Sequence, residues 1–420
     1  LKPNGVDFFH IGADEVYPWV GADEKEPLRR VSPWCECPEC RKIPEADRYL
    51  EYVLRLHKHL KNRGMKKVGM WYDSLQRGGK LNEETVRRFE KEGLRDTVVL
   101  HWWRYQDFFE TIRPELGLTT WVTPMTGYFH WVKYLNHLEN VFNALRVGFE
   151  QGTEGTEAYG VFDRSFHRNH YCLAEYSWNQ NGTGDLEDFK KKYDKLLFGK
   201  NWRQAARAFR YLDGVVSTYG TSSLVESLFH YTYAYAFTPE NAFIRANYPQ
   251  AILNKLMDNP LRVLSLLHGV RTEMEKAVKI FSDPTPWTEM GLPYKDIYTI
   301  ECERIRVVTK IFTQMATVLR DYRRMQKETE LRKEDASKSL SNALKTLQDS
   351  LNDLDTVMLT IEKIRDHFVV PQTLRELSLM RRSLEKLKTE LEQVDERVKK
   401  GTVTLPDLDS MKFEPIQWIG

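Results

Sequence analysis

The sequence has few cysteines, almost no net charge and no long apolar run. No apolar stretch approaches the ~18 residues of a membrane-spanning helix, so no membrane partner is expected. The 62 basic and 60 acidic residues nearly cancel, and a chain without a strong field of one sign is not expected to bind nucleic acid. Five cysteines, an odd number with three in one cluster, do not make a disulfide framework. We therefore expect a reducing, cytoplasmic location.

The chain is long and apolar enough for two or three globular domains. It has 420 residues, of which 41% are hydrophobic and 12% aromatic. The first residues lack the basic and apolar regions of a secretion signal. Leu1 is not an initiator Met, so we expect the chain to begin within a longer protein.

Short β-type runs alternate with amphipathic helical segments up to about residue 200. The pattern predicts strands at 6–13, 66–73, 96–103, 118–124 and 157–164. It predicts helices at 44–64, 82–93, 134–152, 170–179 and 186–199. Strands that alternate with helices indicate βα units around a parallel sheet. A closed (β/α)8 barrel needs eight strands and ~250 residues, so these five units alone cannot close one.

Beyond residue 200 the periodicity becomes helical. Apolar residues repeat at alternating spacings of four and three along two stretches, separated by Pro371: Leu340, Leu344, Leu347, Leu351, Leu354, Met358 and Ile361, then Leu377, Met380, Leu384, Leu387, Leu391, Val394 and Val398. Such heptads predict an antiparallel helical hairpin over about 335–400, within an α-helical domain at 201–420. The repeats suit a packed bundle or the seam of a homodimer, and a dedicated binding role is the alternative.

Two adjacent acids, Asp14 and Glu15, follow the first predicted strand in "FHIGADEV" (9–16). Successive strand residues point to opposite faces, so both acids can face one pocket only where the backbone turns, and Gly12 and Ala13 permit such a turn. They would lie at the carboxyl end of a parallel strand, where barrel enzymes keep their active sites. The alternative is a strand-to-helix loop with two solvated acids.

Adjacent carboxyls suit one form of glycoside hydrolysis. The common retaining layout uses two carboxyls ~5 Å apart on different strands. Consecutive acids instead suit a reaction in which the sugar's 2-acetamido oxygen is the nucleophile. One acid protonates the leaving group, and the other orients the acetamido N–H and balances its developing charge.

The motif "FHIGADEV" resembles the His-x-Gly-Gly/Ala-Asp-Glu signature of family 20 glycoside hydrolases, the β-N-acetylhexosaminidases, and is most similar to the hexosaminidase D-like branch. "GMWYD", "VVLHWW", "TPMTGYFHW" and "GVFDR" resemble segments of this family's strands five to eight, and "HYCLAEYSWN" resembles the helix that follows. The resemblance implies a TIM barrel of which residues 1–200 are the C-terminal part. It also implies that strands one to three precede Leu1 and that the fragment alone is inactive.

The resemblance assigns roles to single residues. Asp14 would orient the acetamido group, and Glu15 would be the general acid/base. Pocket walls around the sugar would come from Trp71, Trp102 and Phe162. The remaining substrate contacts would be Tyr128 to the acetamido oxygen, Asp73 to a sugar hydroxyl, and His10, for which a satisfied core histidine is the alternative.

Two acids that usually hold the far side of the sugar are absent. His130 stands where many members have the Asp of Tyr-x-Asp on strand seven, and Phe162, Asp163 and Arg164 stand where many have Trp-x-Glu on strand eight. These departures leave the choice between N-acetylglucosamine and N-acetylgalactosamine open.

A cysteine cluster follows the acid motif in "WCECPEC", with Cys35, Cys37 and Cys40. Cys-Pro-x-Cys resembles a zinc knuckle, but a structural zinc site needs four ligands and no second cysteine pair follows. Reduced thiols in a loop are the alternative. The proposed catalysis needs no metal or other cofactor.

The sequence therefore supports two hypotheses. The first is a retaining exo-β-N-acetylhexosaminidase that acts on glycans with a terminal N-acetylhexosamine. The second is a catalytically impaired sugar-binding or scaffolding protein on the same fold.

Overall fold

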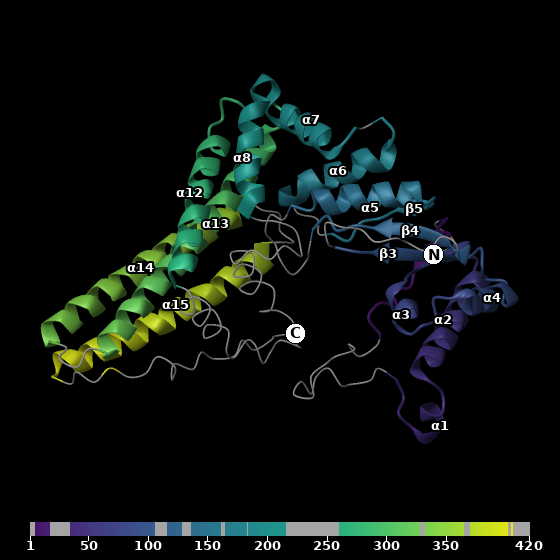
Figure 1. Cartoon of the computed structure of the whole chain (residues 1–420), viewed down its shortest axis with the longest axis horizontal. Coiled ribbons are helices and arrows are strands. Elements are labelled where there is room, and N and C mark those ends of the chain that lie inside the picture. Colours follow the sequence, from purple (N-terminus) through teal and green to yellow (C-terminus); the bar gives the residue numbers. More distant parts are fainter. Residues whose placement is uncertain are drawn as a thin grey trace. The chain divides into compact units, whose positions relative to one another are not determined.

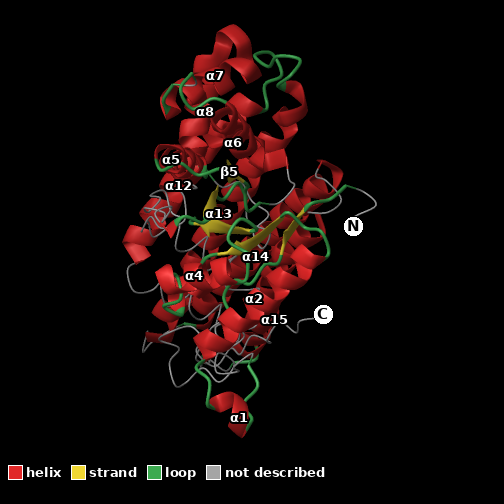
Figure 2. Cartoon of the chain, turned by 90° about the vertical axis from the view of Figure 1, so that its right-hand side faces the viewer, coloured by secondary structure: helices red, strands yellow, loops and turns green. Residues whose placement is uncertain are grey.

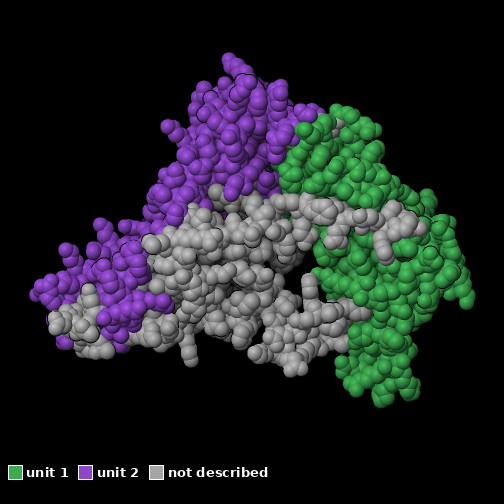
Figure 3. Space-filling view, in the orientation of Figure 1, with its two compact units in different colours: residues 1–126, 137–160, 169–186 green, residues 127–136, 161–168, 187–420 purple. Residues whose placement is uncertain are grey.

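The computed structural model describes residues 5–16, 34–105, 116–127, 136–160, 164–182, 184–215, 260–327, 332–364, 370–401 and 405. The chain divides into two compact units (Figure 3). The first contains residues 1–126, 137–160 and 169–186, and the second contains 127–136, 161–168 and 187–420. The main boundary along the chain therefore falls near residue 186 rather than at 200.

The first unit is built on a five-stranded parallel sheet (Figure 1). The strands pair in chain order: β1 (Phe8–His10), β2 (Lys67–Trp71), β3 (Val98–Trp103), β4 (Thr119–Thr123) and β5 (Gly155–Thr156). The first four lie within the predicted ranges. β5 lies before the predicted 157–164, because pairing with β4 begins where the Glu154 N–H donates to Thr120 and continues to Tyr159. Gly155 and the flanking Glu154 and Glu157 have little β propensity, so the sequence pattern did not indicate a strand here.

Helices connect the strands, as a βα pattern requires. They are α1 (Pro38–Arg41), α2 (Glu45–Asn62), α3 (Asp73–Arg77), α4 (Glu83–Lys91) and α5 (Leu138–Glu150). After β5 come the 3-10 turn η4 (Arg164–Phe166), which belongs to the second unit, and α6 (His167–Trp178). The short α1 and α3 were not predicted. Among these, α2 packs on β2 and α5 on β4. The strands are yellow in Figure 2.

The two faces of the sheet differ in chemistry. Fully buried apolar side chains point toward the helices: Val68, Met70, Leu100, Trp102 and Val122. The opposite face carries rings, namely Phe8, His10, Trp71, His101 and Trp121, which contact one another. We call this second surface the concave face.

The sheet curls toward the concave face. Phe8 on β1 stacks on Trp121 of β4 with ring centroids 5.3 Å apart. In a flat sheet these strands would lie three spacings, or roughly 14 Å, apart. Gly69 permits the crowding, because a Cβ there would come within 2.6 Å of His10 and 2.7 Å of His101. The first unit is thus an α/β assembly around a curled parallel sheet.

The second unit is helical. Its elements are α7 (Leu186–Phe198), the 3-10 turn η5 (Gly199–Asn201), α8 (Trp202–Val215), α12 (Pro260–Phe281), α13 (Leu292–Lys327), α14 (Lys333–Ile364) and α15 (Val370–Lys399). Successive helices pack in the pairs α8–α12, α12–α13, α13–α14 and α14–α15. None of the described helices combines the length and the apolar character that crossing a lipid bilayer requires.

The last two helices form the predicted antiparallel hairpin. Near the start of α14, the Ser337 hydroxyl donates a hydrogen bond to Asp395 near the end of α15. Further along α14, Asp355 accepts a hydrogen bond from Arg381, which lies earlier in α15. The two helices therefore run in opposite directions. Heptad residues fill the seam and are buried: Leu340, Leu347, Leu354 and Ile361 from α14, and Leu377, Leu384, Leu391 and Val398 from α15. Burial of this apolar stripe is the main source of stability for the pair.

Candidate active site

The acid motif lies in a tightly turned segment just after β1. Gly12 and Ala13 both have φ of 70°, and Glu15 has φ of 51°. Left-handed backbone at a residue other than glycine costs on the order of 1 kcal/mol or more and persists only where the surroundings impose it. The segment, residues 12–16, is called the acid loop below.

Hydrogen bonds from three other elements impose this conformation. Trp71 donates its N–H to the Gly12 carbonyl at 3.0 Å, and the Tyr49 hydroxyl of α2 donates to the Ala13 carbonyl at 2.8 Å. The Glu15 N–H donates to Oδ2 of Asp73 at 3.0 Å, at the start of α3. The left-handed turn replaces strand alternation, so the two acids need not point to opposite faces of the sheet.

Asp73 connects the acid loop to the next strand. Besides the Glu15 N–H, its carboxylate accepts the indole N–H of Trp103 at 3.4 Å. Burial raises the pKa of Asp73, the Glu15 N–H opposes this, and the nearby Asp14 charge adds to it. Three carboxyls, those of Asp14, Glu15 and Asp73, therefore gather at the carboxyl end of β1 and β2. Asp14 and Glu15 are exposed, and Asp73 is buried.

His10 lies beneath the acid loop. Its Nδ1 accepts the Gly12 N–H at 3.0 Å, and its ring meets Trp71 edge-on with centroids 4.6 Å apart. Burial lowers the pKa of His10 to about 4, and the adjacent His101 contributes. The ring is thus neutral near pH 7, and its proton lies on Nε2, which has no hydrogen-bond partner among the described residues.

His101 presents the opposite hydrogen-bonding group. Its Nδ1 lies 2.5 Å from Oε1 of Glu157, just beyond β5. A carboxylate only accepts, so Nδ1 donates the proton, and in the neutral imidazole Nε2 keeps its lone pair. That Nε2 is buried and also has no partner in the described part of the chain. The concave face therefore offers one donor, at His10, and one acceptor, at His101.

The two histidines and Glu157 lie close enough together to suggest a metal site, since one ligand atom from each falls within 4.8 Å of the others. The tautomer of His10 argues against it. Its Nδ1 accepts a backbone N–H, so the Nε2 lone pair is not available to a cation. These residues suit a polar organic ligand better than a metal.

The structure brings together five of the predicted site residues: His10, Asp14, Glu15, Trp71 and Asp73. It does not bring Trp102 to them. Trp102 is 4% exposed on the helix-covered face and stacks on Tyr72, with centroids 4.0 Å apart. The prediction of Trp102 as a wall beside Trp71 does not fit this position, because the side chains of a strand alternate. Tyr128 and Phe162 lie outside the described residues.

Three residues of the site were not predicted: Trp103, His101 and Glu157. Trp103 is on the concave side of β3, where its indole reaches Asp73. The run "VVLHWW" is buried nearly throughout, so it carries no alternation that would show which Trp faces the acids. Glu157 follows the strand whose bounds were misjudged, and only the correct bounds would have placed it at the carboxyl edge.

The predicted cysteine cluster also forms. One sulfur each from Cys35, Cys37 and Cys40 lies within 4.8 Å of the other two. The backbone N–H of Cys40, together with the other two thiols, lowers the pKa of Cys37 to about 7. Hydrogen bonding with Cys37 raises the pKa of Cys40 to about 11. One thiolate near neutral pH therefore lies beside two further thiols.

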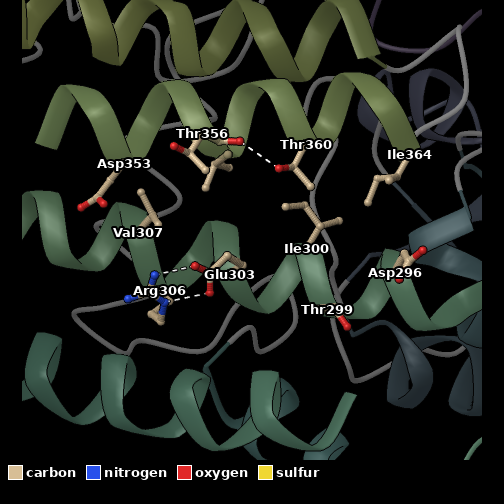
Figure 4. A pocket seen from close by; sticks show the side chains of 11 residues that line it. Asp296, Thr299, Ile300, Glu303, Arg306, Val307, Asp353, Thr356, Thr360 and Ile364 are labelled. Atoms are coloured by element: carbon tan, nitrogen blue, oxygen red, sulfur yellow. Dashed lines mark hydrogen bonds and ion pairs between the residues drawn. The ribbon is translucent and has the colours of Figure 1, made fainter. Parts of the chain in front are cut away.

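The helical unit contains a hollow of about 630 Å³ between α13 and α14 (Figure 4). Its polar groups bond within the protein: Arg306 donates to Glu303 at 2.8 Å, and Thr360 donates to the Thr356 carbonyl. Lys310 pairs with Asp353 at 2.5 Å. Such satisfied groups on helix surfaces indicate packing rather than chemistry. The carboxyl edge of the sheet remains the stronger candidate for a site.

No protein-family model matches this chain, and no curated protein matches it.

Proposed function

We propose that the first unit is part of a (β/α)8 barrel and that its carboxyl edge is the active site of a retaining exo-β-N-acetylhexosaminidase. Its substrates are glycans with a terminal N-acetylglucosamine or N-acetylgalactosamine. The observation that carries the proposal is the strained acid loop, which presents two consecutive carboxylates at the carboxyl end of a parallel strand, beside aromatic rings.

The reaction follows from the sugar's own chemistry. The acetamido oxygen attacks the anomeric carbon, the bond to the leaving oxygen breaks, and the Glu15 carboxyl delivers its proton to that oxygen. Asp14 accepts the acetamido N–H and balances the positive charge that develops there. Water then attacks the same carbon while Glu15 takes up its proton, and the bond from that carbon to the acetamido oxygen breaks, which restores the acetamido group. Two inversions give net retention.

The neighbouring residues have supporting roles. Trp71 and Trp103 supply apolar surfaces for the pyranose ring, because the C–H face of a sugar is apolar and its rim is polar. Asp73 holds the Glu15 backbone at 3.0 Å and so fixes the acid. The Nε2–H of His10 and the Nε2 of His101 offer one donor and one acceptor to sugar hydroxyls.

The proposal is tested by whether hydrolysis requires an acetamido group on the substrate. The full-length protein should hydrolyse aryl 2-acetamido glycosides, show no turnover of the matching 2-hydroxy glycosides, and be inhibited by thiazolines that mimic the cyclised intermediate. Asp14→Asn should lower kcat by about 10²-fold or more. Asp7→Asn is the matched control, since this acid at the other end of the same strand pairs with Lys66 at 2.9 Å. Equal turnover of both glycosides contradicts the mechanism.

A catalytically impaired sugar-binding or scaffolding protein is the second candidate. The observation in its favour is the long α14–α15 hairpin, which is a form used for assembly. Under this candidate, the full-length protein binds a terminal N-acetylhexosamine without turning it over. Calorimetric binding together with absent hydrolysis would decide for it.

A further inference from the structure

We propose that Cys35, Cys37 and Cys40 bind one Zn²⁺ as three thiolates, at a site separate from the acid loop. The site is independent of the proposed hydrolase function. It lies in the segment that leads into α2, where the chain makes the four-residue helix α1.

The sulfur positions carry the inference. The three sulfurs lie within 4.8 Å of one another. Around tetrahedral zinc, with Zn–S of about 2.3 Å, neighbouring sulfurs stand about 3.8 Å apart. A contraction of about 1 Å or less therefore completes the site. A cysteine pair used only for disulfide exchange needs two sulfurs, and the third has no role in that chemistry.

The backbone is arranged as in a metal-thiolate turn. The N–H groups of Cys40 and Glu39 bond toward the Cys37 sulfur, and Arg41 returns its N–H to the Cys37 carbonyl at 3.0 Å. Hydrogen bonds of this kind hold a thiolate in place and disperse its charge. Pro38 sets the turn, because its ring fixes φ and it has no N–H to satisfy.

Charge balance is also favourable. Binding replaces three S–H bonds by three Zn–S bonds, releases three protons to solvent and leaves a net charge of −1. Arg48 lies beside the site and donates to the Cys35 carbonyl at 2.6 Å. Glu36 and Glu39 pair with Arg41 and Lys42, and no described carboxylate or imidazole joins the three sulfurs. The fourth position is thus assigned to water or another small ligand.

The site would fix the start of α2. Arg48 in α2 donates a hydrogen bond to the Cys35 carbonyl. Tyr49, the residue after Arg48, packs against Trp34, and its hydroxyl donates to the Ala13 carbonyl in the acid loop. A metal on Cys35 would therefore restrain the segment next to the residue that supports the acid loop. Zinc removal should raise hydrogen exchange in residues 34–50, and unchanged exchange contradicts this restraint.

The test uses the full-length protein, equilibrated with Zn²⁺ and a competing chelator and then measured for metal by mass spectrometry. One zinc per chain is expected. Cys37→Ser should weaken zinc binding by about 100-fold or more. Loss of a residue that only hydrogen-bonds a metal ligand can already weaken binding by about 100-fold, and loss of a ligand itself should cost at least as much. Glu39→Gln in the same turn is the matched control and should bind as the native chain does. Equal zinc retention by Cys37→Ser means adventitious binding and overturns the proposal.

A second measurement needs no variant. Zinc should protect the three thiols from alkylation in the native protein, and chelation should expose them together, as read by peptide mass spectrometry. Cobalt should give a thiolate charge-transfer band that falls by about a third when one cysteine is lost. A chain that retains no zinc and forms a Cys37–Cys40 disulfide in air is a redox pair instead, and this result also overturns the proposal.

Discussion

The concave face of the sheet and the seam of the α14–α15 hairpin are built in opposite ways. The seam buries leucines at heptad spacing, with their side chains almost fully covered. The concave face holds histidines and tryptophans, leaves the Nε2 atoms of His10 and His101 unpartnered among the described residues, and borders a strained loop. A region optimised only for stability would resemble the seam. The departures on the sheet therefore indicate where function lies.

The two units should respond to pH in opposite directions, and this is the largest expected effect. Burial lowers the pKa of His137 in the first unit to about 3. The folded state therefore disfavours protonation of His137. The contribution of His137 to the free energy of unfolding is fully present above the ordinary pKa of about 6.5 and is lost as pH falls below it, by up to roughly 5 kcal/mol. Burial raises the pKa of Asp194 in the second unit to about 7. The contribution of Asp194 to the stability of the folded state is fully present below its ordinary pKa of 3.8 and is lost as pH rises toward 7.

Hydrogen exchange of peptides from α5 and α7, measured between pH 4 and 8, checks the direction of the pH dependence of stability in each unit. Intrinsic exchange rates must be corrected for pH. Asp194→Asn should stabilise the α7 region by roughly 2–4 kcal/mol at pH 8 and by little at pH 4. A gain that does not grow with pH would contradict the assignment to Asp194.

The next effect is on the seam alone. Leu384→Ala removes a fully buried side chain of α15 and should cost about 3 kcal/mol. Leu359→Ala is the matched control, because Leu359 on α14 is 57% exposed, and it should cost less than about 0.5 kcal/mol. Hydrogen exchange of α14 and α15 measures both changes. Similar costs for the two leucines would mean that the seam does not stabilise the hairpin.

A methyl group at Gly69 should disturb the concave face. The added Cβ would meet His10, His101 and Phe8 at 2.6 to 2.9 Å. These contacts come from three packed rings, so Gly69→Ala should cost about 2 kcal/mol and lower the proposed glycosidase activity. Gly269→Ala in α12 is the control in the other unit. Nothing lies within 4 Å of its added Cβ, and the helix should gain about 0.5–1 kcal/mol. A Gly69→Ala variant with unchanged stability would show that the concave face is loosely packed.

A helix cap in the first unit gives the smallest effect. The Asn82 side chain accepts the Thr85 N–H at the start of α4. Asn82→Ala should cost about 1 kcal/mol, whereas Asn82→Asp keeps the accepting oxygen and should cost little. Urea unfolding followed by exchange in α4 would separate the two. An equal loss in both variants would assign the stability to another contact of Asn82.

Element types were largely predictable because they depend on local periodicity. Four strands follow from short β-type runs, and the main helices and the heptad hairpin follow from apolar spacings of three and four residues. The short helices α1 and α3 carry too few turns for a period to register. The fifth strand was misplaced because it is short and begins at Gly155.

The site was predictable as far as the motif itself extended. His10, Asp14, Glu15, Trp71 and Asp73 converge because they belong to two adjacent strand ends. Trp103, His101 and Glu157 depend on the register of β3 with β2 and on the true start of β5. Register is set by pairing between distant segments, and a strand buried on both faces has no alternation that reveals it.

The proposed role of Glu15 as the general acid is tested most directly by varying the leaving group. In the full-length protein, Glu15→Gln should lower kcat/KM by about 10³-fold for a 2-acetamido glycoside with a poor, sugar-like leaving group. For a dinitrophenyl leaving group, which departs without a proton, the loss should be at most about 10-fold. An equal loss with both leaving groups, or no loss with either, would contradict the assignment of Glu15.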